Sequence, residues 1–308
     1  MSKVAILFPG QGSQFINMGA DFKQFESYNQ VQSKLFELMP ETEKALAGKL
    51  DINQTCYAQP LLFANQAGIL DVIKGLYQVE DYSVAGFSLG EYSAYYASDV
   101  YDLDTGLKVI QTRSQVMDSV SSTYSTKIVL GLTKDKLTTV VSELNSELTN
   151  KVIISNYNLE KQLLINFEQD DYTVVIERLK NAGAKRILDL AVSGPFHTNI
   201  YAEAANQFQQ YIGEQPLSAP SQQLYLNLTG RKYNNEDLAV VMHDQMISGV
   251  QWKTEIESMI EDGVETFIEL GSKSVVSNMV KKINRKVNII TIENVTDLDK
   301  LEDVWNKK

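Results

Sequence analysis

The stretch over residues 82–94 constrains the fold more than any other part of the chain. It reads as a short strand, a tight turn and a helix, with Ser88 in the turn between Gly86 and Gly90. In such a G-x-S-x-G pattern the glycines let strand and helix pass closely, while the serine hydroxyl is exposed on a strained turn. The amide of Leu89, at the start of the helix, would point toward a developing oxyanion. The pattern indicates an α/β fold around a nucleophilic serine, with plain glycine-rich packing as the alternative.

Length, charge and cysteine content limit the class of protein. The chain has 308 residues, enough for one large domain with an insertion or for two domains. Its formal net charge of −11 argues against a general binder of nucleic acid or anionic membranes, because both attract positive charge. A single cysteine, Cys56, excludes an intrachain disulfide framework and offers no metal cluster. The N-terminal apolar run is too short for a signal peptide, so we expect a cytoplasmic protein.

The first third of the chain predicts one strand followed mainly by helices. The apolar run at residues 4–8 is typical of a buried strand, and it leads into a glycine-rich loop that contains Gln11. This loop lacks the spacing and the lysine of a phosphate-binding loop. Residues 21–75 look mostly helical, and we expect Pro60 to begin a helix, because proline is favoured in the first helical turn.

A helix is expected over residues 102–120, where apolar side chains recur at helical spacing. Arg113 lies beside this apolar stripe. Its guanidinium must either reach water along the aliphatic stem or meet an anion, because an unpaired buried charge is costly. A structurally paired arginine is a further alternative, and the sequence leaves these interpretations open.

The middle of the chain predicts a separate small subdomain. Its strands are expected at 127–132, 151–155, 162–167 and 186–192, and its helices at 134–147 and 171–182. This βαββαβ order is the ferredoxin-like arrangement. In it, residues 157–162 would form the turn between the central strands, with Asn156 and Asn158 available as polar contacts.

These patterns together define the expected fold class and domain organisation. We predict an α/β protein with an α/β-hydrolase-like large subdomain and an inserted ferredoxin-like small subdomain. The large subdomain comprises residues 1–125 and 191–308, and the small one comprises residues 126–190.

His197 is the candidate partner of the serine. It lies in a loop after the last strand of the small subdomain, the kind of place where α/β folds collect catalytic groups. The other histidine, His243, lies in an apparently helical segment and is read as structural or superficial. A serine with an imidazole base suits nucleophilic acyl transfer. No acidic third member stands out, so an amide or a backbone carbonyl would orient the imidazole, and Gln245 is a candidate.

The last part of the chain predicts two more strands, near 224–228 and 264–270, each followed by a helical segment. The basic run at residues 281–286 is read as a solvated face, or as a docking spot for an acidic partner in this acidic chain.

The ordered set of motifs resembles the malonyl-CoA:acyl carrier protein transacylases, and the match extends over essentially the whole chain. Each motif alone is weak, whereas the ordered set is highly specific. The set comprises Gln11 in Pro-Gly-Gln-Gly-Ser-Gln, Gln59-Pro60, Gly-Phe-Ser-Leu-Gly-Glu91, Arg113, Asn-Tyr-Asn158, Gly-Pro-Phe-His197, and Gln245 before Val-Gln-Trp252.

The resemblance implies a ping-pong reaction. Ser88 would attack the malonyl thioester with His197 as base, coenzyme A would leave, and the phosphopantetheine thiol of an acyl carrier protein would take the malonyl group. In the family, the amides at the positions of Gln11 and Leu89 form the oxyanion hole. The glutamine matched by Gln245 helps to hold the histidine.

The resemblance also implies how the acyl group is recognised. The arginine matched by Arg113 pairs with the free carboxylate of malonyl. A guanidinium suits this role because it is planar, permanently charged and able to donate two parallel hydrogen bonds to a carboxylate. Phe196 resembles the bulky residue of relatives that exclude α-methylated acyl units, so we expect malonyl rather than methylmalonyl. Asn158 is the expected polar contact to substrate. Malonyl-CoA is a substrate, and no metal or organic cofactor is expected.

Departures from the family pattern keep other functions open. Phe87 stands where many members have histidine, residues 121–127 replace a small-residue stretch, and residues 271–273 replace glycine-proline-glycine. One alternative is a discrete acyltransferase serving a polyketide or hybrid peptide-polyketide assembly line. Others are an acyl-thioester hydrolase with the same serine and histidine, and a non-catalytic carrier-binding module. The expected partners are an acyl carrier protein and malonyl-CoA; nucleic acid and membranes are not expected, and the oligomeric state is left open with a monomer as the working expectation.

Overall fold

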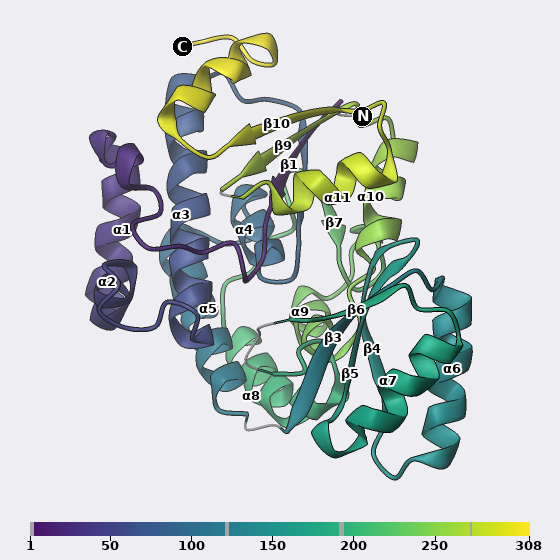
Figure 1. Cartoon of the computed structure of the whole chain (residues 1–308). Coiled ribbons are helices and arrows are strands. Elements are labelled where there is room, and N and C mark those ends of the chain that lie inside the picture. The colour runs from purple at the N-terminus through teal and green to yellow at the C-terminus, as the bar shows by residue number, and fades with distance from the viewer. Residues whose placement is uncertain (1–2, 121–122, 191–193, 272) are drawn as a thin grey trace.

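The computed structural model describes residues 3–120, 123–190, 194–271 and 273–308, which form a large and a small subdomain (Figure 1). The large subdomain contains a six-stranded sheet in the order β10-β9-β1-β2-β7-β8. Neighbouring strands are parallel except β8, which runs antiparallel to β7. The strands are β1 (Val4–Phe8), β2 (Tyr82–Gly86), β7 (Gln223–Leu226), β8 (Arg231–Lys232), β9 (Thr266–Leu270) and β10 (Asn288–Ile292).

Helices cover both faces of this sheet, which explains why its central strands are continuous apolar runs. In β1, Ile6 and Phe8 belong to one buried cluster, whereas Ala5 and Leu7 belong to another on the opposite face. Figure 1 shows α3 and α4 on one side of the sheet and α10 and α11 on the other. The helices of this subdomain are α1 (Glu26–Leu38), α2 (Pro40–Leu46), α3 (Thr55–Leu76), α4 (Gly90–Ala97), α5 (Leu103–Asp118), α8 (Ala202–Ile212), α9 (Leu238–Ile247), α10 (Trp252–Glu261) and α11 (Val275–Ile283).

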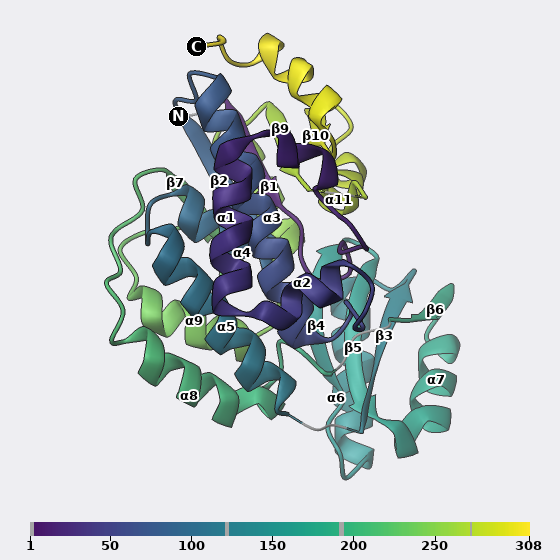
Figure 2. The same ribbon diagram turned by 90° about the vertical axis from the view of Figure 1, so that its left-hand side faces the viewer.

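The long helix α3 corrects one expectation about the chain. Pro60 does not begin a helix but lies inside α3, which starts at Thr55. Figure 2 shows α3 beside α1. Proline in a helix interior removes one backbone donor and is normally unfavourable. Here Ala58, Gln59 and most of the residues that follow them in the helix are buried. Burial of a long helix in the core stabilises it more than one missing hydrogen bond destabilises it.

The small subdomain has its own antiparallel sheet and its own core. The sheet order is β4-β5-β3-β6, and Leu137, Leu144, Val175 and Leu179 from two helices pack on one face. This is the ferredoxin-like topology, so the predicted fold class is confirmed. The elements are β3 (Tyr124–Leu130), α6 (Lys134–Glu147), β4 (Ile153–Leu159), β5 (Gln162–Glu168), α7 (Tyr172–Asn181) and β6 (Arg186–Asp189).

Two details of the small subdomain differ from the expectation. The strand β4 continues to Leu159, so Asn156 and Asn158 lie in a strand rather than in a turn. Irregular pairing of β4 with β5 hides this continuation, because two register shifts break the alternation of buried and exposed residues. The strand β6 ends at Asp189, and residues 191–192 of the expected strand lie outside the described residues.

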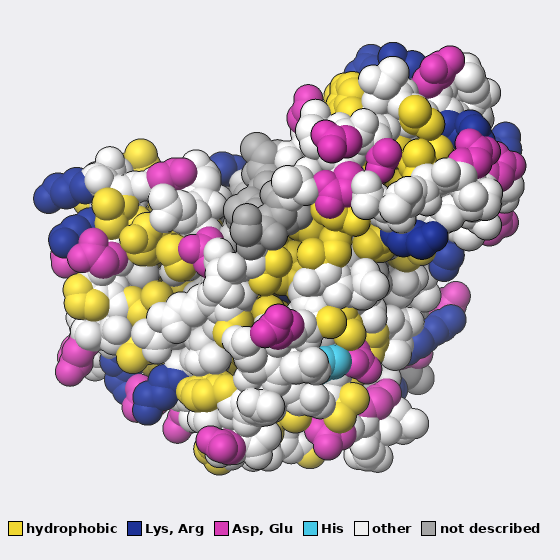
Figure 3. Space-filling model, turned by 90° about the horizontal axis from the view of Figure 1, so that it is seen from below, with side chains coloured by type: hydrophobic (Ala, Val, Ile, Leu, Met, Phe, Trp, Pro, Cys, Tyr) yellow, Lys and Arg dark blue, Asp and Glu magenta, His cyan; other side chains and the backbone are white. Residues whose placement is uncertain are grey.

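The surface seen from below carries both acidic and basic side chains (Figure 3). Hydrophobic side chains are visible where the two subdomains meet. Among the described helices, none combines the length and the apolar composition required to cross a bilayer.

Candidate active site

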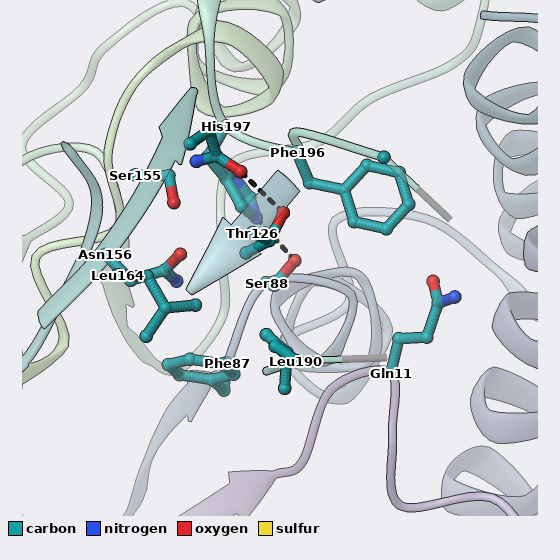
Figure 4. Close-up of a pocket in the computed structure, with 12 residues that line it drawn as sticks. Gln11, Phe87, Ser88, Thr126, Ser155, Asn156, Leu164, Leu190, Phe196 and His197 are labelled. Atoms are coloured by element: carbon teal, nitrogen blue, oxygen red, sulfur yellow. Dashed lines mark hydrogen bonds between the residues drawn. The ribbon is translucent and has the colours of Figure 1, made fainter. Parts of the chain in front are cut away.

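The carboxyl ends of two neighbouring strands bring the candidate residues together. β1 pairs with β2 in parallel, with Phe8 opposite Gly86, so the loop containing Gln11 and the turn containing Ser88 leave the sheet side by side. In open α/β sheets this edge is where ligands bind. Figure 4 shows Ser88 at the centre of a pocket there, with Phe87 on one side and Phe196 on the other.

The turn at Ser88 has the geometry of a nucleophile elbow. Its backbone is left-handed, with φ 55° at Ser88, and α4 starts two residues later at Gly90. A Cβ on Gly90 would lie 1.9 Å from the carbonyl oxygen of Phe8, and one on Gly86 would lie 1.9 Å from the carbonyl carbon of Gly90. Both positions therefore require glycine, since backbone atoms of two elements meet there.

Ser88 and His197 are hydrogen-bonded to one another at the centre of the site. Ser88 Oγ lies 2.6 Å from His197 Nε2 (Figure 4). His197 Nδ1 lies 2.7 Å from the backbone carbonyl oxygen of Gln245. Because a carbonyl oxygen only accepts, Nδ1 carries the proton and Nε2 is the acceptor for the serine hydroxyl. The imidazole is thus oriented by a backbone carbonyl in the position where many triads use a carboxylate.

The environment of His197 keeps its imidazole neutral. Its side chain is almost fully buried. Burial, together with the positive charge of Arg113, lowers the pKa of His197 from its usual 6.5 to about 4, and the Gln245 carbonyl opposes this only in part. At neutral pH the ring is therefore available as a base rather than as an imidazolium.

Gln245 contacts three members of the site. Besides its carbonyl contact to His197, its Nε2 donates to the backbone carbonyl oxygen of Ser88 at 2.9 Å. Its Oε1 accepts from Arg113 at 3.3 Å. Gln245 lies near the end of α9, so this helix positions the serine, the histidine and the arginine together.

The candidate oxyanion donors are the backbone amides of Gln11, which lines the pocket, and of Leu89, which directly follows Ser88. Within the described ranges, the N–H groups of Gln11 and Leu89 donate no hydrogen bond to another residue, whereas the Ser88 N–H donates to Asn227. The Gln11 side chain instead points away from Ser88, where it contacts Thr55 (Figure 4). Free, preorganised amides of this kind can stabilise an oxyanion.

Arg113 is fully buried, which excludes the alternative that it reaches water. Its guanidinium donates to Gln59 Oε1 at 2.6 Å and to Gln245 Oε1, and it lies 4.6 Å from the ring centroid of Tyr92. Within the described part of the chain, its Nε has no hydrogen-bond partner and no ion pair joins it to a carboxylate. A charge so placed remains able to bind an anionic ligand.

The pocket at Ser88 is lined by both subdomains and has an empty volume of about 450 Å³. Phe196 lines it and packs against Tyr201, at 5.5 Å between ring centroids. Arg113 and Asn158 are not among the described lining residues; Asn156, earlier on the same strand, is. The described lining comprises Gln11, Phe87, Ser88, Thr126, Ser155, Asn156, Leu164, Asn166, Leu190, Gly194, Phe196 and His197. His243 is hydrogen-bonded elsewhere, to Asp244 and Asn206.

Sequence reasoning missed several polar residues around the site. Asn227 accepts from the Ser88 amide and follows a strand that neighbours β2. Its place at a strand's carboxyl end was a signal that could have found it. Thr126 and Asn166 line the pocket from facing positions of β3 and β5, and they are hydrogen-bonded to one another. Asn166 lies between apolar residues of β5 and could have indicated a functional face, whereas Thr126 lies between Ser125 and Lys127 and gave no such signal.

Comparison with known proteins yields a consistent set of relatives. Residues 6–300 match the acyl transferase domain family. The chain is 33% identical to the malonyl CoA-acyl carrier protein transacylase of Staphylococcus aureus strain MSSA476, covering 100% of this chain and 99% of the relative. It is 31% identical to the protein of that name from Bacillus subtilis strain 168, covering 95% and 94% of the two chains.

Solved structures with the same fold include an acyl carrier protein S-malonyltransferase and a malonyl-transacylase. An acyl carrier protein S-malonyltransferase from Vibrio cholerae O1 has a TM-score of 0.89 and 29% identity, covering 97% of this chain and 100% of that one. A malonyl-transacylase solved in complex with its type II polyketide synthase acyl carrier protein has a TM-score of 0.90 and 25% identity, covering 98% and 100%.

Proposed function

The chain belongs to the acyl transferase family, and on that premise we propose that it moves malonyl from malonyl-CoA to the phosphopantetheine thiol of an acyl carrier protein. Its enzyme class is that of its relatives, the malonyl CoA-acyl carrier protein transacylases, which are acyltransferases. The observation that carries the proposal is the 2.6 Å contact between Ser88 Oγ and a neutral, oriented His197, with the buried Arg113 nearby.

In the first half-reaction Ser88 Oγ attacks the thioester carbonyl carbon while His197 Nε2 takes the hydroxyl proton. The amides of Gln11 and Leu89 stabilise the oxyanion of the tetrahedral intermediate. When the carbon–sulfur bond breaks, His197 returns the proton to the coenzyme A sulfur. A malonyl ester on Ser88 remains. In the second half-reaction the same residues act in reverse order, with the carrier protein's thiol as nucleophile.

Arg113 selects the acyl group. We propose that its guanidinium binds the free malonyl carboxylate, since its contacts to Gln59 and Gln245 are to neutral amide oxygens. A charge-assisted bidentate pair with a carboxylate is stronger than hydrogen bonds to amides. Neither Arg113 nor Asn158 is among the described lining residues, but Arg113 is connected to Ser88 and His197 through Gln245. We therefore keep the role of Arg113 and propose Asn156, which lines the pocket, in place of Asn158 as the polar contact to substrate.

Phe196 limits the size of the acyl group. Its ring lines the pocket next to His197 and is supported from behind by Tyr201. An α-methyl group on the acyl chain would have to displace this ring. We therefore propose malonyl rather than methylmalonyl as the preferred group, with a discrimination of about 1–3 kcal/mol, the usual contribution of one methyl contact.

The carrier protein docks, in this proposal, beside the turn between β4 and β5. A groove there is lined by Lys161, Lys253 and Lys282, the last of which belongs to the basic run at residues 281–286. Glu160 and Glu257 line the same groove and are both paired with Lys253, so Lys161 and Lys282 are the lysines we propose for contact with an acidic partner. We place the reaction in fatty-acid or polyketide synthesis. Since the base, the oxyanion donors and the anion-binding group all come from the chain, we propose that it needs no metal or organic cofactor.

Intact-protein mass spectrometry tests the proposal. The enzyme is mixed with malonyl-CoA and then with a phosphopantetheinylated carrier protein. We expect a malonyl adduct on Ser88 that moves to the carrier, and no adduct on the Ser88→Ala variant. An adduct that is lost only to water would identify a thioester hydrolase, and absence of any adduct would contradict the proposal.

A further inference from the structure

Asn227 lies in a buried hydrogen-bond network directly behind the nucleophile turn. It follows β7 and its side chain is 0% exposed. Its Oδ1 accepts from the Ser88 N–H at 2.7 Å, and its Nδ2 donates to the Gly86 carbonyl oxygen at 2.7 Å. Because a backbone N–H only donates and a carbonyl only accepts, both contacts require the same orientation of the side-chain amide. The amide thus spans the turn and fixes the backbone on both sides of Phe87.

The remaining polar groups of Asn227 are also engaged. Its Nδ2 donates to Glu255 Oε2 at 2.8 Å, and its backbone N–H donates to Glu91 Oε2 at 2.8 Å. Its carbonyl oxygen accepts from the backbone N–H of Gln251 at 2.8 Å. Every polar group of Asn227 itself is engaged, whereas Glu255 Oε1 has no hydrogen-bond partner within the described residues. Because all four polar groups of Asn227 have partners, its side chain is held in one arrangement. Contacts to Glu91, Glu255 and Gln251 therefore fix the position of Asn227, and Asn227 in turn fixes the backbone of the turn at Ser88.

The turn needs such support because its conformation is strained. Ser88 is not a glycine and has φ 55°, a state that costs about 1–3 kcal/mol and persists only when the surroundings determine it. The Ser88 N–H is also the amide nearest to the nucleophile. That group is bonded to Asn227, whereas the next amide in the turn, that of Leu89, has no acceptor within the described residues.

We propose that Asn227 is a positioning residue for acyl transfer, which acts by holding the Ser88 backbone so that Oγ meets His197 Nε2 and the Leu89 amide meets the oxyanion. Glu255 supports it by accepting from the Asn227 amide. This inference depends on the proposed function in one respect, namely that Ser88 is the nucleophile.

The Asn227→Ala variant tests the proposal. We expect kcat for malonyl transfer to fall on the order of a hundredfold, the cost of misplacing a reacting group by about 1 Å, with a much smaller change in KM. Labelling of Ser88 by a fluorophosphonate probe should slow in parallel. The probe needs only an activated serine, so its rate reports on the positioning of Ser88 whatever the acyl donor is. If the parent enzyme is labelled by the probe but does not accept malonyl, the proposed function is contradicted. The role of Asn227 can still be tested in that case by the labelling rate.

Asn145 supplies a matched control. Like Asn227, its side chain donates to one backbone carbonyl and accepts from one backbone N–H. Both groups belong to Val152, at 3.0 Å and 2.7 Å, and Asn145 lies on α6 in the small subdomain. Asn145→Ala should lower Tm without lowering kcat. Equal losses of kcat in the two variants at equal loss of Tm would overturn the proposal.

A compensating pair keeps the proposal testable if Asn227→Ala does not fold. Asn227→Asp keeps an acceptor for the Ser88 N–H but turns an acceptor toward Glu255 and Gly86. Adding Glu255→Gln supplies a donor to that position. The double variant should be labelled at least about tenfold faster than Asn227→Asp alone, a coupling of the size found for residues in one network. Labelling of Asn227→Asp at the parent's rate, or absence of any coupling, would show that the network does not position the serine.

Discussion

Acylation of Ser88 should persist far into the acid range, because His197 is held as a neutral base. Burial and the charge of Arg113 lower the pKa of His197 from 6.5 to about 4. At about pH 5, a histidine with the lower pKa is about 90% neutral, whereas one with the usual pKa is about 3% neutral. The structure therefore predicts an acylation rate at that pH about thirtyfold higher than an ordinary histidine would allow.

Rapid-quench measurement of the malonyl adduct across the pH range provides the assay. The single-turnover rate at about pH 5 should lie within about twofold of the neutral rate, given the neutral fraction above. A parallel series with p-nitrophenyl acetate, which has no ionisable group, separates the titration of His197 from that of the malonyl carboxyl. Circular dichroism at each pH verifies that the enzyme is folded. An acid limb with a midpoint near 6.5 in both series would refute the reasoning.

The cause of the shift can be tested as well. In Arg113→Met the buried positive charge is absent, so the pKa of His197 should rise and the acid limb should move to higher pH. The p-nitrophenyl acetate series is the appropriate readout, since it does not depend on carboxylate recognition. An unchanged acid limb would mean that burial alone lowers the pKa of His197.

Three further predictions follow from the site and its surroundings. Arg113→Ala should lower kcat/KM for malonyl-CoA relative to acetyl-CoA on the order of a hundredfold, as expected for loss of a charge-assisted pair of about 3 kcal/mol; an unchanged ratio would remove its proposed role. Phe196→Ala should increase kcat/KM for methylmalonyl-CoA relative to malonyl-CoA by about tenfold or more, which competition between the two donors measures. Burial and the neighbouring Glu91 raise the pKa of Glu255 well above its usual value, so its contribution to stability is present below about pH 4.5 and is lost as pH rises. Glu255→Gln should therefore increase Tm relative to the parent more at about pH 8 than at about pH 5, and equal changes at both would count against a buried carboxyl with a raised pKa.

Much of the fold could be predicted because it depends on local patterns. The strand, turn and helix around Ser88 require two glycines at fixed spacing, and the βαββαβ order of the small subdomain follows from alternating periodicity. The start of α3 could not be predicted from Pro60, since tertiary burial outweighs the local preference of proline.

The site was harder to predict where it depends on backbone groups and distant contacts. The sequence offered an amide or a backbone carbonyl, with Gln245 as candidate, as the group that orients His197, but it could not choose between them. The partner of His197 Nδ1 is the Gln245 backbone carbonyl, a group that any residue at that position provides. Asn227 contacts Ser88 across 139 positions of sequence. A lone asparagine after a strand is ordinary turn chemistry until its partners are known. For Arg113 the sequence left open whether its guanidinium reaches water, is paired structurally or meets an anion, and complete burial excludes only the first. Its contacts to Gln59 and Gln245 could not be derived from the sequence.

The three contacts of Gln245 have a consequence for anyone who wishes to redesign the acyl preference of this enzyme. Gln245 contacts Arg113, Ser88 and His197. A substitution of Arg113 or Gln245 that is made to admit a neutral or larger acyl group therefore also disturbs the contacts that hold the base and the nucleophile. A substitution on this side of the site should thus change acyl selectivity and turnover together. Variants with new substrates should arise more readily from the Phe196 side of the pocket, which does not share this residue, than from the arginine side.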